Sequence, residues 1–235
     1  RLCRDWSSDV CSSDLIWAVS AASATVLREY GFKGPIEIVD NGTERKDPDP
    51  EKVRTAEQFY GLSADPLLLF VGQMNWKKNI RRILESAGLL KCRNIPFQLV
   101  MAGQGPAEKD IRKLAEELDL SQQVVFTGHV SDPRILDGLY ARANLLIFPS
   151  LYDNAPMVVR EAAALGTPSL LARGSSAAEV VRDDQNGLLA EDSTPDVAAR
   201  IAWALANPEY TRELGLAAQR TIPRYWDEVI VEILG

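Results

Sequence analysis

Short apolar runs alternate with amphipathic segments along most of this chain. The apolar runs are typical of buried strands and cover residues 36–39, 66–73, 96–103, 123–128, 144–150, 167–173 and 186–191. The amphipathic segments have the spacing of helices and cover residues 78–90, 107–120, 131–143, 156–166, 175–184, 194–206, 208–220 and 223–234. A polar segment with two prolines, residues 46–52, predicts a linker.

This alternation predicts an α/β fold with a doubly wound parallel sheet of Rossmann-like type. Continuous apolar strands are buried on both faces, and right-handed crossovers place helices over each face. Ligands of such sheets bind beyond the carboxyl ends of the strands. We therefore expect the functional site among four loops, residues 72–79, 102–106, 148–156 and 172–177.

Charge and cysteine content narrow the class of protein. The net charge of −7 argues against nucleic acid as a partner, because phosphate-backbone binding needs basic patches. No apolar run reaches the roughly 18 residues that a membrane helix needs. Cys92 alone lies outside the first fifteen positions, which fits a reducing cytoplasm, and we expect it to be a small buried side chain at a helix end.

The opening stretch RLCRDWSSDVCSSDL has no helical or strand period. The spacing of Cys3 and Cys11 matches no metal motif, and the only histidine, His129, is far away in the sequence. DWSSDVCSSDL resembles the translation of a common short-read sequencing adapter. We expect residues 1–15 to be non-native and disordered, with the gene interrupted near Ile16.

The segment FPSLYDNAPMVVREAAALG carries the strongest local signal for a ligand site. It places Asp153 after a buried strand, Pro156 in the first helical turn and Glu161 along the helix. The free amides of that turn attract an anion, and two carboxylates can accept hydrogen bonds from sugar hydroxyls. The alternative is structural: Asp153 or Asn154 caps the helix, and Glu161 is a solvated helix residue.

Three smaller motifs have structural alternatives as well. Gly103 and Gly105 fit either a tight turn beside a ligand or a plain strand-to-helix turn. Ser176 and Glu179 predict a capping box for the helix that follows them. Asn186-Gly187 predicts a turn.

Two long segments, LLFVGQMNWKKNIRRILES and VVFTGHVSDPRILDGLYARANLLIFPSLYDNAPMVVREAAALGTPSLLARGSSAAEVVRDDQNGLL, resemble the donor-binding half of the retaining family-4 glycosyltransferases. The resemblance implies the C-terminal domain of the GT-B fold, with the N-terminal acceptor domain largely missing. It implies four segments: adapter-derived residues 1–15, an acceptor-domain remnant and hinge at 16–45, the donor domain at 46–222, and a helix at 223–235 that crosses back. Tyr225 and Trp226 give that helix a docking surface.

In that family a pair of glutamates, spaced as Asp153 and Glu161 are here, contacts the transferred sugar and the ribose. Lys78 matches the lysine that grips the diphosphate, whereas Gln73 stands where the family has an arginine. Lys77, Arg81, Arg82 or Arg173 are the cations that would compensate, and His129 lines the base without acting as a catalytic base. The resemblance thus implies catalytic roles for Lys78, Asp153 and Glu161. It places further donor contacts at Gly72, Gln73, Gly103, Gly105, Gly128, His129, Val130, Asn154, Ala155, Pro156 and Met157.

The resemblance predicts a retaining hexosyltransferase whose donor is a UDP- or GDP-sugar, with no metal and no cofactor. The acceptor is unknown. Glycolipid or polysaccharide synthesis is the expected setting, in the cytoplasm or peripheral to the inner face of the membrane through the missing domain. We expect the chain to be inactive without that domain. The alternatives are a non-catalytic nucleotide-sugar binding module and a sugar-nucleotide epimerase; a nicotinamide dehydrogenase is disfavoured because no GxGxxG follows the first strand.

Overall fold

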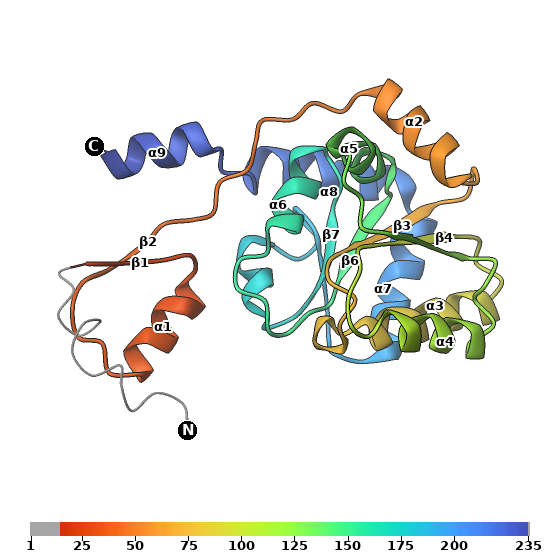
Figure 1. Cartoon of the computed structure of the whole chain (residues 1–235), viewed down its shortest axis with the longest axis horizontal. Coiled ribbons are helices and arrows are strands. Elements are labelled where there is room, and N and C mark those ends of the chain that lie inside the picture. The colour runs from red at the N-terminus through yellow and green to blue at the C-terminus, as the bar shows by residue number, and fades with distance from the viewer. Residues whose placement is uncertain (1–14, 235) are drawn as a thin grey trace.

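The computed structural model describes residues 15–234. The expectations for the adapter-like stretch, and for Cys3 and Cys11 within it, lie outside these described residues. Within them no helix is long and apolar enough to cross a membrane. The chain forms a six-stranded sheet flanked by helices and a separate two-stranded sheet (Figure 1).

The large sheet is parallel throughout and has the strand order β5-β4-β3-β6-β7-β8. Its central strands are continuous apolar runs that are buried on both faces, which is why the apolar pattern located them. The prediction of a doubly wound parallel sheet is confirmed. The strands are β3 (Leu67–Val71), β4 (Gln98–Ala102), β5 (Val124–Gly128), β6 (Leu145–Phe148), β7 (Ser169–Ala172) and β8 (Leu188–Ala190).

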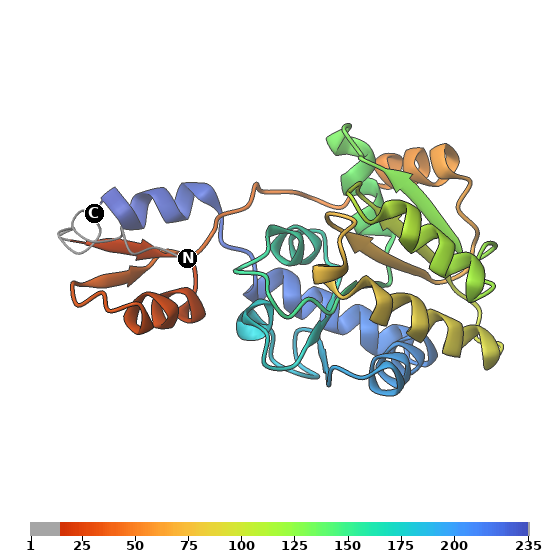
Figure 2. The ribbon, with the colours of Figure 1, turned by 60° about the horizontal axis from the view of Figure 1, so that its bottom comes forward.

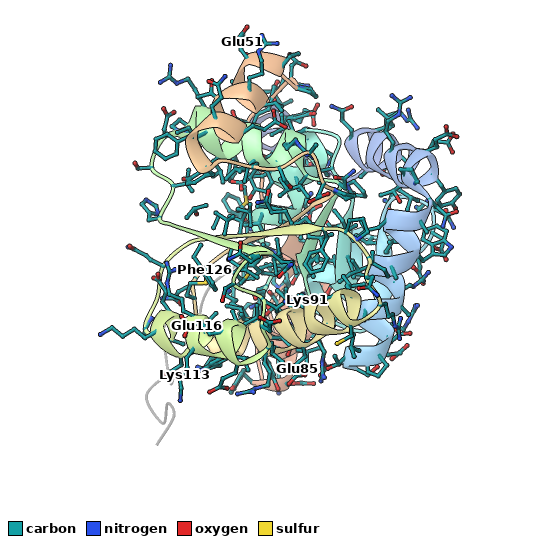
Figure 3. The ribbon with its side chains drawn as sticks, turned by 90° about the vertical axis from the view of Figure 1, so that its right-hand side faces the viewer. Glu51, Glu85, Lys91, Lys113, Glu116 and Phe126 are labelled. Carbon is teal, nitrogen blue, oxygen red and sulfur yellow. The ribbon has the colours of Figure 1, made fainter. Side chains whose placement is uncertain are left out.

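Helices cover both faces of this sheet. On one face α3 (Ile80–Cys92) packs against α4 (Glu108–Glu117) and α7 (Thr194–Ala206). On the other, α2 (Pro50–Tyr60) packs against α5 (Pro133–Arg142), and α6 (Met157–Ala164) lies between α5 and α8 (Pro208–Thr221). Figure 3 shows the two helix layers from the side, with the labelled Lys113 of α4 pointing away from the sheet.

A smaller unit lies to one side of the large sheet (Figures 1 and 2). It consists of the parallel strands β1 (Ile16–Ala18) and β2 (Ile36–Ile38), the helix α1 (Ala21–Glu29) between them, and α9 (Trp226–Leu234) beside them. Two connectors join it to the large sheet and meet where the Thr43 amide donates to the Arg224 carbonyl at 2.7 Å. The domain boundaries at residues 45 and 222 stay a prediction.

Three local predictions are wrong. Residues 46–52 are not all linker, because Asp49 caps a helix that begins at Pro50 and ends against left-handed Gly61. The segment 175–184 forms only the short 3-10 helix η2 (Ser176–Val180), and Ser176 and Glu179 form no capping box. Cys92 ends α3 but is exposed, because it lies off the face that carries the buried residues.

Candidate functional site

The connections leave the centre of the large sheet in opposite directions. The chain passes from β3 to β4 on one side and from β6 to β7 on the other, although β3 and β6 are neighbours. A crevice opens at the carboxyl ends of the strands at such a switch point. The loop after β3 carries Lys78, and the loop after β6 carries Asp153. The topology therefore brings together two residues that are far apart in the sequence.

Lys78 and Asp153 form an ion pair across this crevice. Lys78 ends the 3-10 helix η1 (Trp76–Lys78), and its ammonium group binds Asp153 Oδ1. Both side chains are mostly buried, at 24% and 18% exposure. Asp153 Oδ2 is buried without a hydrogen-bond partner among the described residues. A buried carboxylate oxygen with no donor is costly, and a ligand hydroxyl would satisfy it.

The loop that carries Asp153 is held by contacts outside its own helix. Ser176 donates to the Asp153 carbonyl, and the Asn41 amide donates to the Ala155 carbonyl at 3.1 Å. Ala155 adopts the left-handed conformation, at φ 43°. The capping residue of α6 is Pro156, with no side-chain cap bond, so the interpretation of Asp153 or Asn154 as the cap is wrong. The Val159 amide donates to the Pro156 carbonyl at 3.3 Å, whereas the Met157 and Val158 amides have no acceptor among the described residues and are left for a ligand.

Glu161 is not a solvated helix residue either. It is half-buried on α6, and its Oε2 accepts a hydrogen bond of 2.8 Å from the hydroxyl of Tyr140 on α5. Tyr140 is fully buried. Burial raises the pKa of Tyr140 well above its usual value, and the nearby Glu161 charge adds to this shift. No sequence motif singles out Tyr140, because an aromatic residue on the apolar face of a helix is typical of a hydrophobic core.

A cavity of about 280 Å³ lies beside the ends of β3, β4 and β5. It brings together five of the predicted site residues: Gly72, Gln73, Gly103, His129 and Val130. Val71, Ala102 and Leu136 supply apolar wall, and Gln104 adds an amide. A cavity of this size, with apolar sides and a few polar groups, suits a small ligand or one part of a larger ligand.

Gly105 and Gly128 do not line this cavity but shape the loops around it. Gly105 packs against the backbone of Met74, where a Cβ would lie 2.5 Å from the Met74 carbonyl oxygen. Gly128 ends β5, and its carbonyl accepts from the Gly103 amide at 2.8 Å. Their contribution is to hold the loops after β3, β4 and β5 together.

Gln73 stands where the resembled family has an arginine, and most of the cations proposed to compensate for it make other contacts. Arg173 pairs with Asp183 at 2.6 Å and with Glu191, and Arg82 pairs with Asp192 at 3.0 Å. Arg81 lies over the ring of Trp76. Lys77 is exposed, with no ion pair among the described residues. Lys78 is thus the cation that reaches the crevice in this structure.

The fold and the crevice define a Rossmann-like α/β domain in which loops from neighbouring strands meet at the switch point. The family model described as glycosyl transferases group 1 matches residues 54–221, well over half of the chain. The chain therefore belongs to this family.

Among curated relatives, the chain is 30% identical over 215 residues to the putative glycosyltransferase EpsD of Bacillus subtilis, covering 88% of this chain and 56% of EpsD. It is 29% identical over 167 residues to the alpha-D-kanosaminyltransferase of Streptomyces kanamyceticus, covering 70% and 43%. The chain thus spans about half the length of these relatives.

Solved structures show the same fold. Sucrose-phosphate synthase from Thermosynechococcus elongatus matches with a TM-score of 0.84 at 24% identity, over 95% of this chain and 57% of that one. HepE from Anabaena, in complex with UDP and glucose, matches with a TM-score of 0.83 at 19% identity, over 94% and 62%. The large sheet is therefore the Rossmann-like domain of the GT-B fold.

Proposed function

We propose that this chain is the donor-binding part of a retaining family-4 glycosyltransferase that transfers a hexose from a nucleotide-diphosphate sugar. The observation that carries the proposal is the Lys78–Asp153 pair at the switch point, beside a cavity lined by Gly72, Gln73 and His129. Family membership supports it, as does the UDP bound in the HepE structures.

Each part of the site binds a different part of the nucleotide-sugar donor. The cavity takes the base, and Lys78 with the free amides of α6 takes the diphosphate, whose charge grows as the sugar leaves. Asp153 accepts from hydroxyls of the transferred sugar, and Glu161 from those of the ribose. No group of three or more histidine, cysteine, aspartate or glutamate side chains that could hold a metal ion occurs among residues 15–234.

The acceptor and its setting are proposals drawn from relatives. One relative is named a phosphatidylinositol dimannoside mannosyltransferase, and one solved neighbour is a glycosyltransferase of lipopolysaccharide biosynthesis. We propose that this chain likewise serves glycolipid or polysaccharide synthesis, in the cytoplasm at the inner face of the membrane. Transfer would require an acceptor-binding region like those in the longer relatives, and this chain alone would bind donor without transferring it.

The test is calorimetric binding of UDP and GDP to the wild-type chain and to Lys78→Ala. We expect weak binding by the wild type and a loss of about tenfold or more in Lys78→Ala, because charge-assisted contacts to phosphate are among the stronger ones. Lys77→Ala is the matched control, since it removes a neighbouring exposed lysine, and it should bind within about twofold of wild type.

Two results would contradict the proposal. One is a wild-type chain that binds neither nucleotide at millimolar concentration. The other is equal affinity in wild type and Lys78→Ala. Asp153→Asn adds a second measurement: it frees Lys78 but weakens the sugar contact, so it should bind UDP at least as well as wild type while losing affinity for UDP-glucose relative to UDP.

A further inference from the structure

Tyr140 has a hydroxyl in a place where phenylalanine would pack as well. Its side chain is fully buried in the layer between α5 and the sheet, and its carbonyl accepts from Thr167 Oγ1 at 2.5 Å. Its hydroxyl has a single partner among the described residues, Glu161 Oε2 at 2.8 Å. A buried hydroxyl without a hydrogen-bond partner costs free energy, and Glu161 Oε2 supplies the partner that the Tyr140 hydroxyl needs.

The direction of this hydrogen bond is fixed by the surroundings of the phenol. Burial disfavours the phenolate, and the charges of Glu161 and Asp137 disfavour it further. Tyr140 is therefore protonated and is the donor, while Glu161 is the acceptor. One carboxylate oxygen of Glu161, Oε2, is thus occupied by this hydrogen bond.

The other oxygen of Glu161 is free. Oε1 has no hydrogen-bond partner in the part of the chain that the structure describes, and it is not among the buried unpartnered atoms. The cavity of about 280 Å³ lies near Tyr140, because Leu136, one turn before Tyr140 on α5, forms part of its wall. Fixing Oε2 therefore fixes the rotamer of Glu161 and the position from which Oε1 accepts a bond.

We propose that Tyr140 is a positioning residue that orients the Glu161 carboxylate so that its free oxygen accepts from a ribose hydroxyl of the donor nucleotide. This inference rests on the proposed function, which assigns Glu161 to the ribose. Tyr140 touches no ligand itself. Its contribution is to hold Glu161 in the binding geometry before the nucleotide arrives, which lowers the entropy lost on binding.

The experiment compares the affinities of UDP and 2′,3′-dideoxy-UDP in calorimetry, for wild type, Tyr140→Phe and Glu161→Ala. Tyr140→Phe should weaken UDP about three- to tenfold and leave the dideoxy analogue unchanged, because only UDP offers the ribose hydroxyls. In a Glu161→Ala background the same substitution should have no further effect on UDP, as expected when one residue acts through the other.

The matched control is Tyr210→Phe, which removes a tyrosine hydroxyl that donates to the Asp184 carbonyl at 2.8 Å, away from the crevice. It should leave both affinities unchanged. Urea unfolding of each variant separates loss of fold from loss of positioning.

Tyr140→Phe with wild-type affinity for UDP would overturn the inference, as would an equal loss for both nucleotides, which indicates a merely structural role. In either case retained binding by wild type, with loss in Lys78→Ala, would leave the proposed function standing. A wild-type chain that binds no nucleotide would overturn both.

Discussion

At the scale of single residues, Gly103 and Gly105 are required by the fold before any ligand is considered. Gly103 has φ +137°, and a Cβ there would lie 1.9 Å from the Gly72 carbonyl oxygen. Gly105 meets the backbone of Met74 in the same way, and the Met74 amide donates to the Gln104 carbonyl at 3.1 Å. The close approach is therefore between the loops after β3 and β4, and it forms one wall of the cavity.

Gly103→Ala should destabilise the fold by about 3 kcal/mol or more, since both the backbone conformation and the space exclude a Cβ. Urea unfolding at neutral pH measures this. Gly88→Ala is the control: a Cβ on this α3 glycine meets only Leu118 Cδ2 at 3.8 Å, so it should be neutral or stabilise by up to about 1 kcal/mol. Equal stability of Gly103→Ala and wild type would contradict the close approach.

The sequence pattern located the loops of the candidate site, but not the pairings between their side chains. Motif order placed Lys78 and Asp153 on two loops that end neighbouring strands, and the topology alone decides that their side chains meet. Tyr140 was not predicted, because its helical spacing is the same for a core aromatic residue and for a residue that contacts the site. Only the hydrogen bond to the Glu161 carboxylate distinguishes these two roles.

At the scale of elements, local sequence patterns predicted helices and strands correctly where the packing in the fold favours the same structure as the local sequence. The buried strands were found because a continuous apolar run has one low-energy placement in a parallel sheet. The start of the helix α2 was missed because Pro48 and Pro50 are typical of a linker, although Pro50 follows the Asp49 cap and begins the helix. The capping box failed because Ser176 and Glu179 bond to distant segments, the Asp153 loop and α1.

The helix α6 is tied to both connectors by one buried side chain. Arg160 is 3% exposed and donates to the Ile222 carbonyl at 2.8 Å and to Asp40 Oδ1 at 2.9 Å. Burial lowers the pKa of Arg160, and the Asp40 charge opposes this. Asp40 follows β2 and Ile222 follows α8, so Arg160 sets the position of the helix that carries Glu161 relative to both connectors.

Arg160→Met should therefore lower the free energy of unfolding by about 2–4 kcal/mol, because it leaves the Ile222 carbonyl and Asp40 Oδ1 without their donor. Arg224→Met is the control: its pairs with Glu232 and Asp40 are more exposed, so the cost should stay below about 1 kcal/mol. A double-mutant cycle with Asp40→Asn measures the coupling. Additive effects of the two substitutions would show that the pair contributes nothing.

At the scale of the whole molecule, the two sheets differ greatly in burial. The six-stranded sheet has a continuous core, whereas α1 has no buried residue and β1 and β2 bury only Ala18. The smaller unit leaves Trp17, Tyr30 and Ile38 exposed, at 53%, 79% and 51%. Few buried apolar side chains make local opening inexpensive, so the smaller unit should open far more often than the large sheet.

One contact between the two units is specific. The Glu179 carboxylate accepts from the Ala21 and Ala22 amides, at 3.2 and 3.1 Å, and so occupies the N-terminus of α1 from the large unit. A charged acceptor there satisfies two free amides and interacts favourably with the helix dipole. Glu179 thus supports α1, while Ser176 in the same short helix holds the Asp153 loop.

Glu179→Ala should speed hydrogen exchange in α1 by about fivefold, the effect of losing roughly 1 kcal/mol of capping, with no change in β3 and β4. Exchange followed by mass spectrometry measures both regions in one experiment. Glu209→Ala removes an equivalent charge from the first turn of α8 and should leave exchange in α1 unchanged. If α1 exchanges as slowly as β4 in the wild type, the smaller unit does not open more often than the large sheet. If α1 exchanges at the same rate in the wild type and in Glu179→Ala, the contact does not stabilise the smaller unit.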